Sequence, residues 1–593
     1  MSGPQHNGRP VPVETGVTAA LTRLREAQWG LIALALTAGA GAGLGAIVFR
    51  WLIKTFTQIF SGHADYSDAG HAANPHVPWL GPYFVLLAPA VAGLIYGPLV
   101  QRFAPEARGH GVPEVMLAVK QRGGRIAPQV AVVKSLASAL CIGGGGSVGR
   151  EGPIVQIGSA LGSTLGRVTR LTENRMRVLV ACGAAGGIAA TFNAPLAGVF
   201  FAMELILRDF TVESFGVVVL SSVTASVIGR AAFGTAAFMT LPSFHVVSVG
   251  EFALFALLGL LGGAVGMGFT KVLYKIEDVC DWAWRGPEWA RPAVGGLLLG
   301  VLLLVLPQMY GVGYPVLENA IAGKYVIAFL LLLLVGKIAA TSLTIGIGGS
   351  GGVFAPSLFM GAMLGSAFGS VVHQIAPHAT ASPGAYGLVG MGAVFAGAAR
   401  APITAVIILF ELTGEYTIIL PMMTAIVAAT ILSRRLSADT IYSLKLRRRG
   451  IDIDAPPADP RMAATVDTVM EPVAETLPDN LDTAEASMLL ALSGHGVLPV
   501  ADTDGAYRGV VTARAVAEAL ADHEGAAVLT VGDLTELPTP VTADMTIADA
   551  LQLLVNSAGT GLPVLDASKT ALVGWITHQT VLASLHEREN ASS

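Results

Sequence analysis

The sequence predicts an all-α polytopic membrane protein with broken helices, followed by a small soluble domain. Three observations lead to this fold class. Of the 593 residues, 53% are hydrophobic and only 13% are charged, whereas soluble proteins carry about 25% charged residues. The 71 glycines suit helices that pack closely in lipid. Apolar stretches recur from residue 29 to about residue 433, and the composition becomes more polar after residue 450.

The N-terminal residues and the first apolar run set the start of the membrane domain. Residues 1–28 are polar and contain prolines, so we expect a cytoplasmic segment rather than a cleaved leader, because no short apolar region precedes a cleavage site. The first apolar run, Trp29–Phe49, is long enough to cross a bilayer. The loop Ser61–Pro78 carries three histidines and two aspartates but no Lys or Arg. The positive-inside rule places it outside, as a solvated loop and not a metal site.

Further apolar stretches follow, and several are shorter than the roughly 20 helical residues that a bilayer requires. Glycine or proline interrupts many of them. Short helices at membrane depth are tolerated only where their ends face protein or a water-lined site, and in transporters such segments mark the substrate site. The stretches include Tyr83–Val100, Ala131–Ile142, Val178–Phe192, Val217–Val227, Phe252–Phe269, Pro292–Leu306, Val326–Ile345, Leu388–Phe395 and Ile403–Leu412.

Basic residues gather where the last span ends. The positive-inside rule places this end in the cytoplasm, together with the arginines near the N-terminus. These residues are Arg434, Arg435, Lys445 and Arg447–Arg449, with Arg9, Arg23 and Arg25 at the start of the chain. We therefore expect an integral multi-pass protein of a bacterial inner or plasma membrane with both termini in the cytoplasm. The expected domains are a segment at 1–28, a membrane domain at 29–445, a linker at 446–462 and a soluble domain at 463–593.

An internal repeat is the strongest pattern in the sequence. The block Gly146–Pro153 matches Gly349–Pro356, and the block Asn193–Leu205 matches Arg400–Leu412 in the same order. Two matched blocks, each pair about 200 residues apart, indicate two homologous halves. If each half has an odd number of spans, the halves are inverted, and a binding site is expected where they meet near the membrane midplane.

The repeat contains glycine-rich turns from which helices are expected to start. A helix N-terminus presents free N–H groups and the positive end of the helix dipole, which together form an anion site. Three such turns end in proline, namely Gly109–Pro113, Gly143–Pro153 and Gly346–Pro356. Helix packing alone would explain the glycines of a single turn, but the duplication favours an anion site. Partial charges bind an anion weakly enough for the release that conduction requires.

Glu151 lies between Arg150 and Gly152 in one of these turns. An ionisable residue inside a membrane is a functional candidate. Its carboxylate would compete with an anion for the same donors, so we expect a plug that opens when protonated. A structural ion pair with Arg150 is disfavoured, because neighbouring side chains on a helix do not face each other.

These turns also carry a resemblance to a known family. Gly109–Pro113 (GHGVP), Gly149–Pro153 (GREGP), Gly352–Pro356 (GVFAP) and a tyrosine after the last span resemble the signature set of the CLC chloride channel and transporter family, over about residues 30–445. The resemblance implies a homodimer with inverted halves and one voltage-gated pore per subunit, with Glu151 as the gate. It implies chloride-binding positions at His110, Gly111, Gly149, Arg150, Val353, Phe354 and Tyr442, within motifs marked by Gly109, Pro113, Gly152, Pro153, Gly352 and Pro356.

Two positions depart from the pattern of that family. His110 stands where the family usually has a serine whose hydroxyl binds the central ion; an imidazole could donate a hydrogen bond and make affinity depend on pH, or it could point away. Leu205 stands where antiporters of the family usually carry an inward-facing glutamate. The neighbouring Glu204 is about 100° away around the helix. A passive chloride channel is therefore favoured, with a proton-coupled chloride antiporter as the alternative.

The C-terminal region contains a second, weaker duplication. The segment from Met470 to Thr512 corresponds to the segment from Leu537 to Thr577, and the pair resembles a tandem CBS domain. The resemblance implies a small α/β domain. Such pairs often bind adenine nucleotides through an aspartate three residues after each threonine, but those positions hold Ala515 and Thr580. A structural or dimer-stabilising role is at least as well supported as a nucleotide site, and no cofactor is expected.

Other classes of function fit less well. An intramembrane serine protease would use Ser350 with His373, but the repeat explains the Gly-Ser sequence better. A divalent-cation transporter needs rings of acids, and the membrane region offers few beyond Glu151, Glu204 and Glu411. No P-loop indicates an ATP-driven pump, three cysteines form no disulfide framework, and the acidic tail does not suit a nucleic-acid binder. The expected partners are small anions, protons, lipid and a second copy of the chain, and no enzymatic activity is expected.

Overall fold

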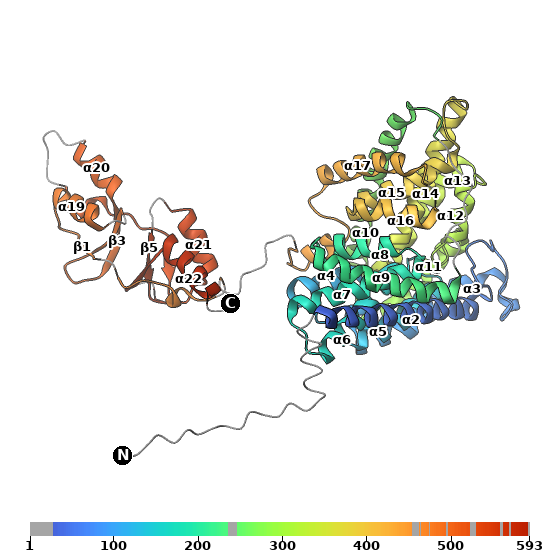
Figure 1. Ribbon diagram of the computed structural model, residues 1–593, viewed down its shortest axis with the longest axis horizontal. Coiled ribbons are helices and arrows are strands. Elements are labelled where there is room, and N and C mark those ends of the chain that lie inside the picture. Colours follow the sequence, from blue (N-terminus) through green and yellow to red (C-terminus); the bar gives the residue numbers. More distant parts are fainter. Residues whose placement is uncertain are drawn as a thin grey trace, which may run out of the picture. The chain divides into compact units, whose positions relative to one another are not determined.

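The computed structural model describes most of the chain, namely residues 28–234, 246–414, 416–453, 462, 464–473, 475–493, 496–521, 529–557, 561–568 and 571–590. The chain forms two compact units that divide after Ile453. The first unit, the membrane unit, consists of helices, and the second is a small α/β unit (Figure 1). The predicted fold class is confirmed.

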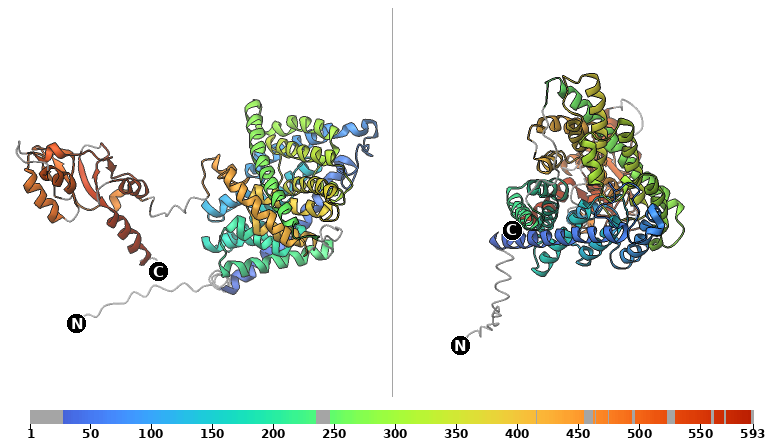
Figure 2. Two further views of the ribbon diagram at one scale, coloured as in Figure 1. Left: turned by 90° about the horizontal axis from the view of Figure 1, so that it is seen from above. Right: turned by 90° about the vertical axis from the view of Figure 1, so that its right-hand side faces the viewer.

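The first half of the membrane unit contains the helices α2 (Gln28–Ser61), α3 (Phe84–Phe103), α4 (Val112–Gln121), α5 (Gln129–Gly143), α6 (Glu151–Val168), α7 (Glu173–Phe192), α8 (Pro195–Phe201) and α9 (Val212–Phe233). The second half contains α10 (Glu251–Ala283), α11 (Arg291–Val305), α12 (Tyr314–Ile321), α13 (Ile327–Gly346), α14 (Phe354–Ile375), α15 (Pro383–Ala399), α16 (Pro402–Thr413) and α17 (Ile419–Leu436). The short helix α18 (Ser443–Arg447) follows. Figure 2 shows these helices from two further sides, crossing at many angles.

Helix lengths within the described residues match the predicted broken spans. Nine helices there are long and apolar enough to cross a membrane, and shorter apolar helices occur at α5, α8, α15 and α16. Proline stands in the first two positions of α4, α8, α11, α12, α15 and α16, where its missing N–H costs nothing. The first span is longer than its apolar run, because α2 continues to Ser61.

The two halves repeat the same packing. Helix α2 packs against α7 and α9 in the first half, as α10 packs against α15 and α17 in the second, and α6 packs on α7 as α14 packs on α15. Equivalent residues of the halves meet in the interior. The N–H of Gly149 donates to the carbonyl of Gly352 at 2.7 Å, and the N–H of Gly352 donates back at 2.6 Å, in an antiparallel bridge. Such reciprocal pairing places a local two-fold axis between the halves.

Glycines allow two helix pairs to approach very closely. A Cβ added to Gly183 of α7 would lie 2.0 Å from the carbonyl oxygen of Gly158 of α6, and one added to Gly158 would lie 2.1 Å from the oxygen of Gly183. The equivalent crossing of α14 and α15 uses Gly361 and Gly390, where both distances would be 2.3 Å. No other residue fits at these backbone contacts, which explains part of the high glycine content.

The C-terminal unit consists of two similar modules. The first contains β1 (Leu477–Pro478), α19 (Thr483–Ser493), β2 (Val497–Ala501), β3 (Tyr507–Thr512) and α20 (Ala513–Ala521). The second contains β4 (Val541–Thr542), α21 (Ile547–Val555), β5 (Gly561–Leu565), β6 (Leu572–Thr577) and α22 (His578–Asn590). Each module has a three-stranded sheet with one parallel and one antiparallel pair.

Contacts across the modules join them. The backbone of Glu471, ahead of the first module, pairs with Trp575 of β6, and the backbone of Glu536, ahead of the second, pairs with Val510 of β3. The ring of Trp575 is 1% exposed and packs with Val497 and Val510. Each module thus has its own core, and a small apolar cluster around Trp575 joins the two.

Candidate functional site

The turns that precede α4, α6 and α14 meet in the interior of the membrane unit. The N–H of Gly109 donates to the carbonyl of Gly349 at 3.0 Å, and the N–H of Gly351 donates to the carbonyl of Gly109 at 3.2 Å. A Cβ added to Gly152 would lie 2.0 Å from the carbonyl oxygen of His110. Together with the Gly149–Gly352 pair, these contacts bring all three sequence-predicted turns together. The motif prolines Pro113, Pro153 and Pro356 lie buried in the first turns of the three helices.

Backbone N–H groups at the start of α14 are available as donors. A trans peptide places its C=O and N–H on opposite sides, so the bond from Gly149 to the carbonyl of Gly352 turns the N–H of Val353 the other way. Within the described part of the chain, the N–H groups of Val353 and Phe354 have no hydrogen-bond acceptor. Unpaired donors at a helix N-terminus form the kind of site that binds an anion.

Two buried lysines hold the loops ahead of α4 and α12. Lys134 Nζ donates to the carbonyls of Ala107 and Gly109, both at 2.8 Å. Lys337 Nζ donates to the carbonyls of Gly311 and Val312 at 3.2 and 3.0 Å. Both side chains are 0% exposed, and they hold equivalent places on α5 and α13. Each lysine fixes the direction of the adjoining peptides. The sequence signal that would have identified both residues is a lysine within an apolar stretch, at the equivalent position of each half.

The carboxylate of Glu151 lies against the N-terminus of α14. Its Oε2 accepts the N–H of Ala355 at 3.3 Å, and its Oε1 accepts the hydroxyl of Tyr314 at 2.8 Å. The side chain is 1% exposed. Glu151 therefore uses a backbone donor that an anion at this helix end would use. The guanidinium of Arg150 lies over the ring of Tyr314, 5.2 Å from its centroid, and 5.5 Å from the centroid of Phe192.

Tyr314 belongs to a fourth turn that sequence reasoning missed. The segment Gly311–Pro315 (GVGYP) is the counterpart in the second half of Gly109–Pro113 (GHGVP). It opens α12 as the other opens α4, and Gly313 has the positive φ of 87° that matches 86° at Gly111. The spacing Gly-x-Gly-x-Pro was the signal that would have found it.

His110 and Tyr442 are buried polar side chains beside the turns. Each is 1% exposed. Within the described residues, neither ring nitrogen of His110 has a hydrogen-bond partner. Its ring lies edge-on to Tyr274, with the centroids 6.2 Å apart. The hydroxyl of Tyr442 likewise has no partner there, and it interacts electrostatically with Glu151. Both side chains are candidates for direct contact with an anion.

Glu204 and Leu205 lie apart from the turns, in the π-helical segment Ala202–Leu207 after α8. Glu204 accepts the N–H groups of Ile403 and Thr404 at 3.2 and 2.8 Å. Its counterpart Glu411 accepts the N–H groups of Leu196 and Ala197 at 3.0 and 2.7 Å. Each carboxylate thus caps the helix of the other half. Leu205 is buried.

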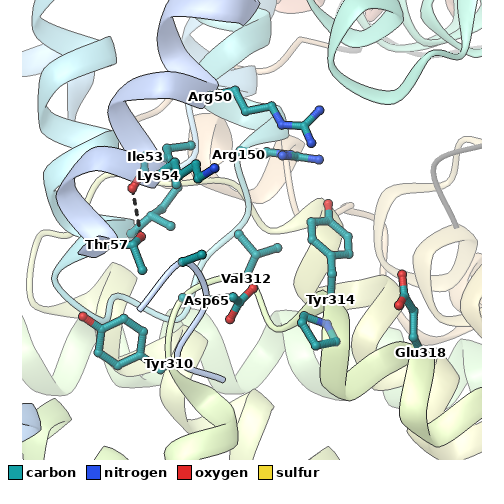
Figure 3. A pocket seen from close by; sticks show the side chains of 14 residues that line it. Arg50, Ile53, Lys54, Thr57, Asp65, Arg150, Tyr310, Val312, Tyr314 and Glu318 are labelled. Atoms are coloured by element: carbon teal, nitrogen blue, oxygen red, sulfur yellow. Dashed lines mark hydrogen bonds between the residues drawn. The ribbon is translucent and has the colours of Figure 1, made fainter. Parts of the chain in front are cut away.

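A cavity of about 410 Å³ lies next to Glu151. Its polar lining includes Arg50, Lys54, Asp65, Arg150, Tyr314 and Glu318. Figure 3 shows the guanidinium groups of Arg50 and Arg150 side by side, with the hydroxyl of Tyr314 pointing toward them. The cavity also touches the loop that follows α2, which the sequence places outside.

The residues needed for the competing functions are not assembled. The hydroxyl of Ser350 bonds to the carbonyl of Ala107 at 2.7 Å and to Ser138 Oγ at 2.9 Å. His373 Nδ1 instead faces Thr380 Oγ1 at 3.2 Å. The serine protease hypothesis is therefore wrong. Among the residues that the structure describes, no cluster of three or more His, Cys, Asp or Glu could hold a metal ion.

The two threonine motifs of the C-terminal unit are closed by local hydrogen bonds. The N–H of Ala515 donates to Thr512 Oγ1 at 3.1 Å, and Thr580 Oγ1 donates to the carbonyl of Thr577 at 2.8 Å. Thr580 also accepts the N–H of Thr577 at 2.8 Å. Neither position carries the carboxylate that would bind a ribose.

Comparisons with known proteins agree with this geometry. Residues 92–434 match the family model described as "Voltage gated chloride channel", and residues 531–587 match the CBS domain. The "H(+)/Cl(-) exchange transporter ClcA" of Vibrio parahaemolyticus is 36% identical over 62% of this chain and 80% of that protein. A crystal structure of "a slow cyanobacterial Cl-/H+ antiporter" is 28% identical and covers 71% of this chain and 97% of its own, with a TM-score of 0.61.

A second solved structure extends the likeness of fold. "A eukaryotic CLC transporter" covers 95% of this chain and 98% of its own at 21% identity, with a TM-score of 0.61. The family match, the duplicated turns and the glutamate on the start of α14 point to the same conclusion. The chain belongs to the CLC family of voltage-gated chloride channels and transporters, and it carries a C-terminal CBS domain.

Proposed function

We propose that the protein transports chloride or a similar small anion across a membrane, through the site between the duplicated turns, with Glu151 as its gate. One observation carries the proposal: the Glu151 carboxylate accepts the N–H of Ala355 beside the unpaired N–H groups of Val353 and Phe354. A carboxylate and a chloride ion compete for such donors. Protonation removes the charge of the carboxylate and with it the advantage over the anion.

The anion ligands in this proposal come from both halves. The N–H groups of Val353 and Phe354, the hydroxyl of Tyr442 and a ring N–H of His110 contact the ion. Backbone groups of Gly111, Gly149 and Arg150 border it. Lys134 and Lys337 hold the adjoining peptides in place without touching the ion, and ligands that carry only partial charges support binding that is weak enough for release.

The proposed transport is passive. Leu205 cannot carry a proton, and the carboxylate of Glu204 is already bound to Ile403 and Thr404. Proton-coupled exchange is the second candidate. It is supported by the names of similar proteins, since the Vibrio relative and the cyanobacterial structure are both described as proton-chloride antiporters, and by the protonatable gate itself.

Purified protein in liposomes with a chloride gradient, with chloride and proton movement recorded together, tests the proposal. We expect chloride flux without stoichiometric proton movement. Glu151→Ala should abolish the pH dependence of flux, whereas Glu411→Gln, which alters a capping carboxylate, should retain it. Stoichiometric proton movement would replace passive transport by exchange. Persistent pH dependence in Glu151→Ala would remove Glu151 as the gate, and no chloride flux at all would overturn the proposal.

The assembly and its orientation complete the proposal. Two copies form a homodimer with one pore in each, as the family membership suggests. Both termini and the basic residues around α18 lie in the cytoplasm of a bacterial cell, which the positive-inside rule supports. Crosslinking in the membrane and protease protection of the C-terminal unit test these two points.

A further inference from the structure

One side-chain hydrogen bond holds the Glu151 carboxylate where it lies. The hydroxyl of Tyr314, the first residue of α12, donates to Glu151 Oε1 at 2.8 Å, while Oε2 faces the N–H of Ala355 at 3.3 Å. The two donors come from different helices and engage different oxygens. They fix both the position and the rotation of the carboxylate.

The counterpart turn shows that the hydroxyl is not needed to build the fold. Val112 occupies the place of Tyr314 in the first half, also as the first residue of its helix and also before a proline. Valine opens α4 without any side-chain hydrogen bond. The tyrosine hydroxyl is therefore an addition confined to the half that faces Glu151.

The ring of Tyr314 is itself held in place. The guanidinium of Arg150 lies 5.2 Å from the ring centroid, a cation–π contact. The charged and titratable groups that face Glu151 or the adjacent cavity are Arg50 and Lys54 of α2, Asp65 of the following loop, Arg150, Tyr310, Glu318 of α12, Lys337 of α13 and Tyr442 before α18. Tyr314 donates a hydrogen bond to Glu151 from this surrounding.

We propose that Tyr314 is a positioning residue that latches the ionised Glu151 in its blocking position, and so sets how acidic the solution in the cavity must become before the gate releases. The inference rests on the proposed role of Glu151 as the gate. A hydroxyl that donates to a carboxylate stabilises the charged form and gives a stronger bond than a neutral pair. Protonation weakens this bond and frees the side chain to leave the donors of α14.

Chloride flux through planar bilayers, measured against pH on each side, tests the latch. Tyr314→Phe keeps the ring under Arg150 and removes the hydroxyl. We expect the pH of half-maximal flux on the cavity side to move upward by about one unit, with flux at neutral pH increased several-fold. Tyr314→Val, which copies the counterpart turn, should give the same direction of shift.

Two comparisons separate the latch from other effects. Tyr310→Phe removes a nearby hydroxyl that donates to the carbonyl of Gly143 at 2.6 Å, and its pH curve should stay in place. Glu151→Ala combined with Tyr314→Phe should behave as Glu151→Ala alone. An unmoved or acid-shifted pH curve in both Tyr314 variants, with Glu151→Ala independent of pH, overturns the latch only. A pH-dependent Glu151→Ala overturns the gate on which it rests.

Discussion

His110 is a buried imidazole without a hydrogen-bond partner among the described residues. Leaving a buried donor unpaired costs about 1–3 kcal/mol. His110 lies where three helices begin. An anion bound there would accept a hydrogen bond from its ring and so remove this cost. The serine that the family usually carries would serve the same purpose with a smaller donor.

His110→Phe keeps a planar ring of similar size and removes the donor. We expect chloride to bind about tenfold more weakly, because a hydrogen bond to a charged group contributes about 1.5 kcal/mol or more. Isothermal titration of the detergent-solubilised protein with chloride measures the change. His110→Gln retains an N–H donor and should bind within about threefold of the unaltered protein. Equal affinity in the Phe variant would show that the ring does not touch the ion.

At the residue scale, the sequence predicted the candidate groups that lie in glycine-rich motifs and missed the candidates that contact them from elsewhere. Glu151, Val353 and Phe354 could be identified because the motif itself contains them. Tyr314 reaches Glu151 across 163 positions of the chain, and Lys337 acts on a loop that precedes its own helix. The sequence around each of these residues does not indicate such contacts. An alignment of the two halves that includes every glycine-rich turn would have pointed to Tyr314.

At the scale of helices, the repeated glycine crossings determine how closely α6 and α7, and α14 and α15, can approach. At each crossing the carbonyl of one helix lies where a side chain of the other would start. Van der Waals contact of this kind is a main source of helix association in lipid, where apolar burial contributes little. These contacts position the helix starts that form the proposed anion site.

Gly183→Ala should force α6 and α7 apart and destabilise the protein by about 1–3 kcal/mol, as overpacking does in other cores. Gly390→Ala should have the same effect at the equivalent crossing in the second half. Thermal unfolding in detergent measures both. The matched control is Gly268→Ala in α10, where an added Cβ would have no atom within 4 Å, and its melting temperature should not fall. A fall as large as that of Gly183→Ala would indicate a general intolerance of alanine.

Apolar runs predicted many of the helices but not their ends or all their members. The run that predicts the first span stops at Phe49, yet α2 continues to Ser61, because a helix can extend beyond the bilayer. Helix α6 was seen as a motif and not as a span, since glycine and serine interrupt its apolar residues. Its side chains are mostly buried against protein, so they do not need the hydropathy that lipid demands.

At the scale of the whole molecule, the two units have separate cores. The C-terminal modules join through Trp575, whose ring packs with Val497 and Val510.

Trp575→Ala should destabilise this unit by about 3–5 kcal/mol, as other large-to-small core changes do, while the membrane unit keeps its stability. Calorimetry of the full chain in detergent should show one transition lowered and the other unchanged. Leu537→Ala, at a side chain that is 79% exposed, is the control. A parallel shift of both transitions would contradict separate cores.

The order of the two units and the fold class could be predicted because composition and motifs differ so clearly between them. Charged residues are scarce up to the last span and the CBS-like duplication follows it. The pairing of Glu471 with Trp575 and of Glu536 with Val510 could not be predicted. Backbone pairing between modules depends on backbone geometry, and the amino-acid composition does not indicate it.

The bond between Gly149 and Gly352 has a consequence for the symmetry of the membrane unit. Each glycine pairs with its counterpart in the other half. In the same way, Glu204 caps α16 and Glu411 caps α8. Residue i meeting j while j meets i is the mark of an isologous interface between identical subunits. The two halves of the present chain thus meet as two identical subunits would, and the exception is the pair of helix starts where one half has Tyr314 and the other has Val112.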